Sequence, residues 1–188
     1  MSTTHQHVCP VENAGSLDNR IRTWVQNPQK ILGPYLKEGM TVLDIGCGPG
    51  FFSIPMAHMV GKSGRVIAAD LQDGMLRKLR DKIQGTDLEK RITLHQCEEQ
   101  RIGLSEKVDL LVAFYMIHEL PDIEGFFHEV SSILKPNGRV FIAEPPFHVS
   151  KTAFEATLRK ARNAGFIPVE QPKVLLSKTV LLKRTIDS

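Results

Sequence analysis

Short apolar runs alternate with amphipathic stretches along most of this chain. Five runs are rich in β-branched and other apolar residues and are bounded by turn-forming or polar residues, which predicts strands at 41–45, 65–70, 91–97, 108–115 and 139–144. Between them, apolar residues recur at helical spacing and predict helices near 52–60, 72–84 and 123–134. Strands that alternate with helices favour an α/β fold built on a parallel sheet.

The C-terminal part departs from this alternation. Ser150 is a candidate N-cap for a helix that carries Phe154, Leu158 and Ala161 on one face and ends at Gly165. Two extended runs follow at 166–173 and 177–184, and the few residues between them suit a hairpin and are too few for a parallel crossover. We therefore expect a doubly wound, mostly parallel seven-stranded sheet with one antiparallel strand.

The composition is ordinary for one globular domain. The chain has 188 residues, of which 41% are hydrophobic and 24% charged, and no apolar run is long enough to span a bilayer. The first residues lack the basic and apolar blocks of a signal peptide, and three scattered cysteines do not form a disulfide framework. We expect a cytoplasmic protein with no membrane partner.

The net charge of +3 is unevenly distributed. Residues 151–188 hold eight Lys/Arg and three Asp/Glu, whereas residues 41–150 hold twelve and fifteen. The basic residues of the tail interleave with apolar ones, which favours a solvated outer face over a nucleic-acid surface. The mildly acidic centre also disfavours a large polyanionic partner, so nucleic acid is an unlikely substrate.

The most informative motif is Val-Leu-Asp-Ile-Gly-Cys-Gly-Pro-Gly at 42–50. Its alternate glycines let the backbone turn sharply and approach a ligand where a strand passes into a helix. Phe51 stands where a dinucleotide-binding loop needs its last glycine. The Asp44 carboxylate would repel a pyrophosphate and suits a ligand that is cationic where it meets the loop.

This motif resembles the first motif of the class I S-adenosylmethionine-dependent methyltransferases, in particular the small-molecule enzymes of the ubiquinone and menaquinone type. Their cofactor carries a sulfonium and an ammonium group and no phosphate. The resemblance covers residues 28–184 and implies that S-adenosylmethionine is bound, and S-adenosylhomocysteine released, by a set that includes Asp44, Gly46, Cys47, Gly48, Gly50, Phe51 and Phe114.

The ends of the second and third strands imply further cofactor contacts. Asp70 lies at the distance past the glycines where nucleotide-binding folds place a ribose-binding carboxylate, with Leu71 and Met75 against the adenine. Asp70 could instead be a solvated or helix-capping residue, and Met75 could be core. The family usually has an Asp where this chain has Cys97, a poor acceptor, so either Glu98 or backbone groups hold the adenine amine.

The segment after the fourth strand resembles the part of the family that closes over the reacting methyl group. His118 has a suitable pKa for a base and Tyr115 could orient an acceptor, although a helix-start histidine bonded to backbone is an alternative. Glu144 closes the fifth strand at the same edge, and His148 follows shortly after. Both could face a substrate, or both could be ordinary polar loop residues. The segment lacks the Asn/Asp, two prolines and aromatic residue typical of nucleobase or amide methylation.

The N-terminal segment carries a second group of candidate residues. Leu17, Ile21, Trp24 and Val25 fall at helical spacing before Asn27-Pro28, and glycine and proline punctuation precedes them. The chain is therefore expected to be one methyltransferase domain over 1–188, with residues 1–30 as a helical lid and 31–188 as the cofactor-binding core. The acceptor-side residues expected from the lid are Cys9 and Trp24.

A metal site is not expected. The terminal cluster of His5, His7 and Cys9 has no second ligand pair, although three thiols at Cys9, Cys47 and Cys97 could converge on a metalloid or a soft electrophile. The activity implied is methyl transfer to a small molecule. The alternatives are methylation of RNA or protein, a non-catalytic cofactor-binding partner, and a nucleotide-dependent oxidoreductase.

Overall fold

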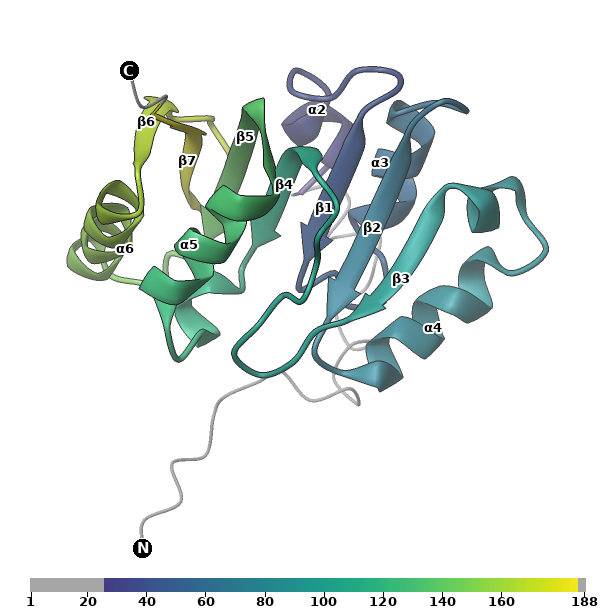
Figure 1. The fold of residues 1–188 in the computed structure, drawn as a ribbon, viewed down its shortest axis with the longest axis horizontal. Helices are drawn as coiled ribbons and strands as arrows, with labels where there is room; N and C mark the ends of the chain where they lie inside the picture. The colour runs from purple at the N-terminus through teal and green to yellow at the C-terminus, as the bar shows by residue number, and fades with distance from the viewer. Residues whose placement is uncertain (1–25, 186–188) are drawn as a thin grey trace, which may run out of the picture.

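The computed structural model describes residues 26–185, which form one sheet with helices on both faces (Figure 1). The seven strands are β1 Thr41–Ile45, β2 Arg65–Asp70, β3 Ile92–Gln96, β4 Val108–Phe114, β5 Leu134–Glu144, β6 Phe166–Glu170 and β7 Lys178–Arg184. The α-helices are α2 Pro28–Leu32, α3 Ser53–Met59, α4 Asp73–Ile83, α5 Ile123–Ile133 and α6 Lys151–Asn163, with 3₁₀ turns η2 Asp87–Lys90 and η3 Ile117–Glu119.

The strand order is β3-β2-β1-β4-β5-β7-β6, and β7 is antiparallel to both of its neighbours. The other neighbouring pairs are parallel. The expected sheet is confirmed, including its single antiparallel strand. The connection reverses direction between β1 and β4, so the carboxyl ends of these strands border the crevice where open α/β sheets bind ligands.

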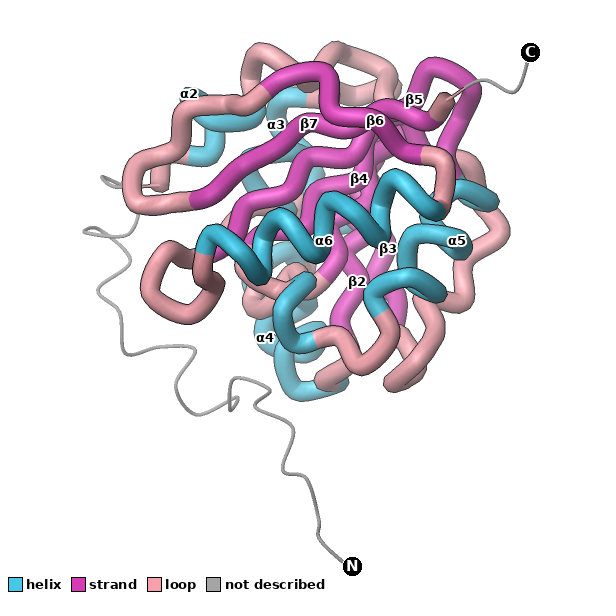
Figure 2. The backbone as a smooth tube through the Cα atoms, turned by 90° about the vertical axis from the view of Figure 1, so that its left-hand side faces the viewer, coloured by secondary structure: helices cyan, strands magenta, loops and turns pink. Residues whose placement is uncertain are grey.

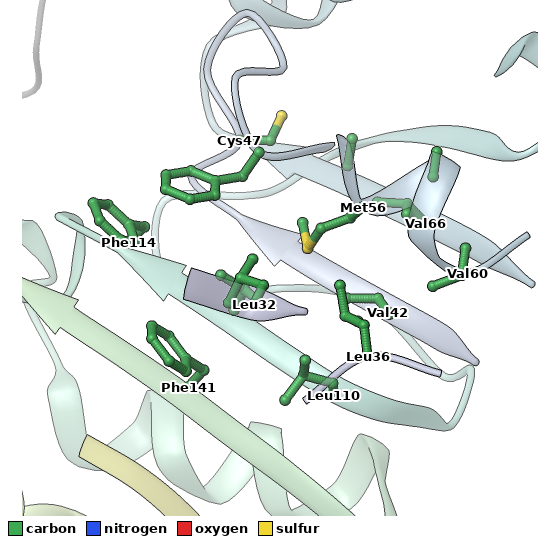
Figure 3. Packing of buried hydrophobic residues seen from close by; sticks show 14 of the residues in the cluster. Leu32, Leu36, Val42, Cys47, Met56, Val60, Val66, Leu110, Phe114 and Phe141 are labelled. Carbon is green, nitrogen blue, oxygen red and sulfur yellow. The ribbon is translucent and has the colours of Figure 1, made fainter. Parts of the chain in front are cut away.

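Two apolar clusters cover the two faces of the sheet. Successive strand residues alternate between them, with Val42 in one cluster and Leu43 in the other. The first cluster joins the sheet to α2, α3 and α4, and Figure 3 shows Cys47 and Phe114 in it toward the carboxyl ends of the strands. The second joins the sheet to α5 and α6, which lie side by side (Figure 2).

The fifth strand begins earlier than the sequence predicts. The predicted helix near 123–134 and strand at 139–144 left residues 135–138 between them, but β5 continues directly from α5. Leu134 pairs with Val108 and Arg139 with Leu110, across a register shift. Lys135 also donates a hydrogen bond to Asp109 of β4 at 2.7 Å. Residues 135–138, which include a proline and a glycine, therefore form a bulge between two positions of β5 that pair with β4.

The C-terminal elements follow the predicted pattern with shorter strands. Ser150 Oγ accepts a hydrogen bond from Ala153 N at 3.0 Å and caps α6, and Gly165 has a φ of +82° where the helix has ended. β6 ends at Glu170, two residues before Pro172, which cannot donate to a ladder. At the other end, Asn27 caps α2 by accepting from Lys30 N at 3.1 Å.

The described part of the chain, residues 26–185, contains no helix with the length and apolar character needed to cross a membrane.

Candidate active site

The glycine loop leaves β1 at the carboxyl edge of the sheet. Gly46, Gly48 and Gly50 have φ values of +70°, +53° and +87°, a region that side chains rarely adopt. A Cβ at Gly50 would run into Leu79 of α4, whereas a Cβ at Gly48 would meet no atom within 4 Å. Gly50 therefore serves helix packing, and the space beside Gly48 is open to a ligand.

Two buried carboxylates flank this loop. Asp44 is 2% exposed and accepts a hydrogen bond from Ser53 Oγ at 2.5 Å. Asp70, 8% exposed, accepts from Gly48 N at 2.8 Å and from Gln72 N at 2.9 Å. Burial raises the pKa of Asp70, and its backbone hydrogen bonds oppose that shift. Asp70 thus both shapes the loop and retains lone pairs that can accept from ribose hydroxyls.

The residues that the sequence predicts for the adenine side lie close to Asp70 in the chain or the sheet. Leu71 is 39% exposed and Met75 is 5% exposed, and Cys97 N donates to Asp70 O at 3.0 Å. Burial, followed by the charges of Asp70 and Glu129, raises the pKa of Cys97 to about 12, so its thiol is uncharged. The Glu98 amide donates to Arg101 O at 3.0 Å, which leaves the exposed Glu98 side chain as the polar group available to a ligand.

Glu129 of α5 holds the loop that follows β3, a role the sequence did not predict. Its two oxygens accept from Ile102 N at 2.8 Å and from Gly103 N at 2.7 Å. His95 Nε2 lies 2.5 Å from Ile102 O on the other side of the same loop. No local pattern relates Glu129 to a loop far from it in the sequence, and only the packing of α5 brings them together.

An aromatic row connects the glycine loop to the acceptor side. Phe52 lies between Phe51 and Phe114, with ring centroids 5.1 Å and 4.2 Å away, and Phe114 lies 4.5 Å from Tyr115. Phe114 is 7% exposed. Cys47 is likewise buried, and burial with the nearby carboxylates raises the pKa of its thiol, so it is uncharged. These side chains form an apolar wall at this edge.

Tyr115 has an unusual backbone conformation and a fully engaged hydroxyl. Its φ is +62°, and its amide donates to Ala143 O at 2.8 Å. Gln26 Nε2 donates to the Tyr115 hydroxyl at 2.9 Å, and Ser177 Oγ lies 2.6 Å from it. The hydroxyl therefore joins the segment entering α2 to the loop before β7.

His118 and Glu144 form a close pair across β4 and β5. Glu144 is 1% exposed, and its oxygens contact His118 Nδ1 at 2.5 Å and Ile117 N at 2.9 Å. The hydrogen bond to Glu144 raises the pKa of His118, and burial partly opposes it. The sequence left Glu144 open between a substrate-facing residue and an ordinary polar residue, and the structure directs both of its oxygens toward Ile117 and His118.

A second histidine, His148, lies near His118 at this edge of the sheet. It is exposed, and its ring centroid lies 6.3 Å from that of His118. Beside it, Phe147 is 86% exposed. Glu119 is partly buried, which raises its pKa.

The remaining expected residues lie outside the described part of the chain. These are Cys9 and Trp24, together with His5 and His7 of the terminal cluster. Within residues 26–185, no group of three or more His, Cys, Asp or Glu side chains is placed to hold a metal ion.

Comparison with known proteins identifies the fold family. A family model described as "Methyltransferase domain" matches residues 36–173, well over half of the chain. The chain belongs to the class I S-adenosylmethionine-dependent methyltransferases. Its matched segment contains the glycine loop, Asp70 and the His118–Glu144 pair, so these are residues of a methyltransferase domain.

Curated relatives share part of the domain. A "Demethylmenaquinone methyltransferase" of Lactobacillus johnsonii is 34% identical over 58% of this chain and 45% of its own length. A "Ubiquinone/menaquinone biosynthesis C-methyltransferase UbiE" of Shewanella sp. is 24% identical over 65% of this chain and 49% of its own. The chain thus spans about half the length of the curated relatives it matches.

Solved methyltransferase structures match over most of the described chain. A SAM-dependent methyltransferase from Aquifex aeolicus superposes with a TM-score of 0.82 at 29% identity, covering 92% of this chain and 97% of that one. The family's cofactor is S-adenosylmethionine. The residues present fit it, because the space beside Gly48 is open and Asp70 offers acceptors for ribose hydroxyls.

Proposed function

We propose that this methyltransferase modifies a small-molecule acceptor at the carboxyl edge of β4 and β5. When bound, S-adenosylmethionine supplies an electrophilic methyl group carried on a sulfonium. The chain's own contribution is to hold the acceptor, exclude water and accept a proton. The observation that carries the proposal is the His118–Glu144 pair, which lies next to the glycine loop.

The link between the pair and the loop is short. A Cβ placed at Gly46 would lie 3.0 Å from Met116 Cβ, so the segment leading to His118 packs directly on the cofactor loop. A base in this place serves an acceptor that must lose a proton, and His118 has a partly exposed side chain, 25% accessible. Tyr115, whose hydroxyl is already engaged, acts by shaping the site through its ring and backbone.

Exposed apolar side chains near Tyr115 suggest that part of the acceptor molecule is apolar. Leu175 and Leu176 are 59% and 57% exposed, and Leu176 O accepts from the Tyr115 hydroxyl at 3.3 Å. Phe147 protrudes from the adjacent loop, where Lys178 Nζ donates to Pro146 O at 3.4 Å. This rim and the names of the curated relatives support a hydroxylated aromatic or quinone-type acceptor with an apolar part.

The N-terminal segment is proposed to close the site. Gln26 is 8% exposed and bonded to Tyr115, so the chain enters the described structure at the acceptor side. Residues 1–30, with Cys9 and Trp24, would then cover the acceptor, with cytoplasmic localisation as the expected setting. Closure matters because methyl transfer needs an aligned acceptor in a dry site.

The decisive experiment supplies S-adenosylmethionine with a labelled methyl group to the full chain. Three pools are offered in parallel: phenols and hydroquinones, total RNA, and denatured protein extract. We expect label in an extractable small molecule, and none with Gly48→Val. Label in RNA, with a rate that falls steeply as salt is raised, would replace the proposal with a nucleic-acid substrate. Tight cofactor binding without label in any pool would indicate a non-catalytic partner.

A further inference from the structure

Each carboxylate oxygen of Glu144 has one close hydrogen-bond partner, and these partners determine whether the oxygen donates or accepts. Its Oε1 lies 2.9 Å from Ile117 N, a backbone amide that can only donate, so Oε1 must accept. Its Oε2 lies 2.5 Å from His118 Nδ1. The side chain ends β5 and is 1% exposed, so water does not compete for either oxygen.

These contacts determine which ring nitrogen of His118 carries the proton. An ionised carboxylate accepts only, so His118 Nδ1 must be the donor in this pair. A neutral His118 then has its lone pair on Nε2. Within residues 26–185, the other ionisable groups near this ring are Glu119 of η3 and His148 from the loop after β5.

We infer that Glu144 is a positioning residue that keeps His118 in the Nδ1–H tautomer, so that Nε2 accepts a proton from the hydroxyl of the methyl acceptor. The inference rests on the proposed function and narrows its substrate class to acceptors with an acidic hydroxyl, such as phenols and enols. The proton moves from the hydroxyl oxygen to Nε2, and its bonding electron pair remains on the acceptor. The ring becomes an imidazolium paired with Glu144.

An amide at position 144 should reverse the tautomer. In Glu144→Gln, the single amide oxygen must face the Ile117 N–H, since two donors cannot face each other. The amide NH₂ then points at His118 Nδ1, which has to accept, and the proton moves to Nε2. The substitution is nearly isosteric, yet it removes the basic lone pair from the position where it is needed.

Nitrogen-15 spectra of histidine-labelled protein test this directly, with His118→Gln used to assign the signal. We expect the neutral ring to be protonated at Nδ1 in the wild type and at Nε2 in Glu144→Gln, with a lower His118 pKa in the variant. Glu155→Gln, an exposed carboxylate on α6, is the matched control and should leave the His118 spectrum unchanged. A wild-type ring protonated at Nε2 overturns the inference, whether or not Glu144→Gln folds.

Kinetics with the acceptor supply the second measurement. We expect Glu144→Gln to lower kcat while S-adenosylmethionine affinity stays unchanged. The comparable carboxylate-to-amide change in a serine-protease triad lowers kcat about 10⁴-fold by imposing the wrong tautomer. The acid limb of the residual rate should also move to lower pH. A reversed tautomer with an unchanged rate overturns the proton-transfer role. Absence of any methylated small molecule contradicts the proposed function and leaves the tautomer result intact.

Discussion

At the scale of single residues, Asp70 has two tasks. Its carboxylate accepts from Gly48 N at 2.8 Å and so helps hold the glycine loop of the neighbouring strand in place. The same oxygens remain available to a ligand. A residue that the sequence predicts as a ribose ligand or as a strand-end cap thus also helps to shape the glycine loop.

Replacing Asp70 should weaken cofactor binding strongly. Asp70→Ala removes hydrogen bonds to a charged group, so we expect calorimetry to show a loss of about 1.5–3 kcal/mol in S-adenosylmethionine binding. Asp70→Asn should recover only part. Asp81→Ala, an exposed carboxylate on α4, is the control. A folded Asp70→Ala protein that binds like wild type would contradict this site.

Gly48 and Gly85 provide a matched pair of substitutions. Both have positive φ, +53° and +73°, and a Cβ at either position meets no protein atom within 4 Å. Valine at each should therefore cost similar backbone strain. We expect Gly48→Val to abolish cofactor binding in calorimetry and Gly85→Val to preserve it. Equal affinities in the two variants would show that the space beside Gly48 is not used.

The His118–Glu144 pair should make stability depend on pH. The folded-state pKa of His118 is raised above its ordinary value of 6.5, so its stabilising contribution is complete below that value. The contribution is lost as pH rises through the raised pKa. Urea unfolding of wild type and His118→Gln should therefore differ most at and slightly below pH 6.5 and converge at higher pH. A difference that grows with pH would contradict the pairing.

At the scale of elements, the loop after β3 depends on α5. Glu129 accepts from two consecutive amides of this loop, and Ile102, 3% exposed, packs into the cluster beneath α5. The loop after β3, which borders the predicted adenine site, is thereby attached to α5, the helix that follows β4 in the chain. Loop conformation and helix packing are coupled.

Removing this attachment should loosen the loop. In Glu129→Ala, both amides lose a charged acceptor, so we expect faster hydrogen exchange at Ile102 and Gly103 and weaker binding of S-adenosylmethionine. Glu124→Ala, on the first turn of the same helix, is the control. Unchanged exchange at the two amides would mean that the loop is held by its apolar contacts alone.

At the scale of the whole molecule, the proposed acceptor side lies where distant segments of the chain meet. The Tyr115 hydroxyl contacts Gln26 and Ser177, which bracket most of the described chain in sequence. The proposed lid is connected to the core through this point. We therefore expect ligand binding at this edge of the sheet to change the solvent exposure of the N-terminal segment.

Cofactor binding should protect residues 1–25. We expect their amides to exchange more slowly with S-adenosylmethionine bound, and the fluorescence of Trp24, the chain's single tryptophan, to change. Deletion of residues 1–25 should preserve folding and abolish turnover. Equal protection with and without cofactor, or a truncated protein that cannot fold, would place the segment in the core.

The sequence by itself determined the fold and the position of the glycine loop. Thr41–Ile45 and Arg65–Asp70 are strands at the predicted residues, because an uninterrupted apolar run ended by polar or glycine residues is a local signal. The closing antiparallel strand was equally readable, since the distance between two extended runs limits their connection. The glycine spacing and the acidic residue at the end of a strand are likewise local features, because each is recognised from neighbouring positions in the sequence.

Only the tertiary structure decided how the chemistry-bearing side chains are partnered. The sequence left the role of Glu144 open, and parallel pairing of β4 and β5 brings it to Ile117 and His118. The attachment of Glu129 to the loop after β3 had no sequence signal at all. Such contacts join residues far apart in the chain, and each depends on strand register and helix packing, which no local pattern records.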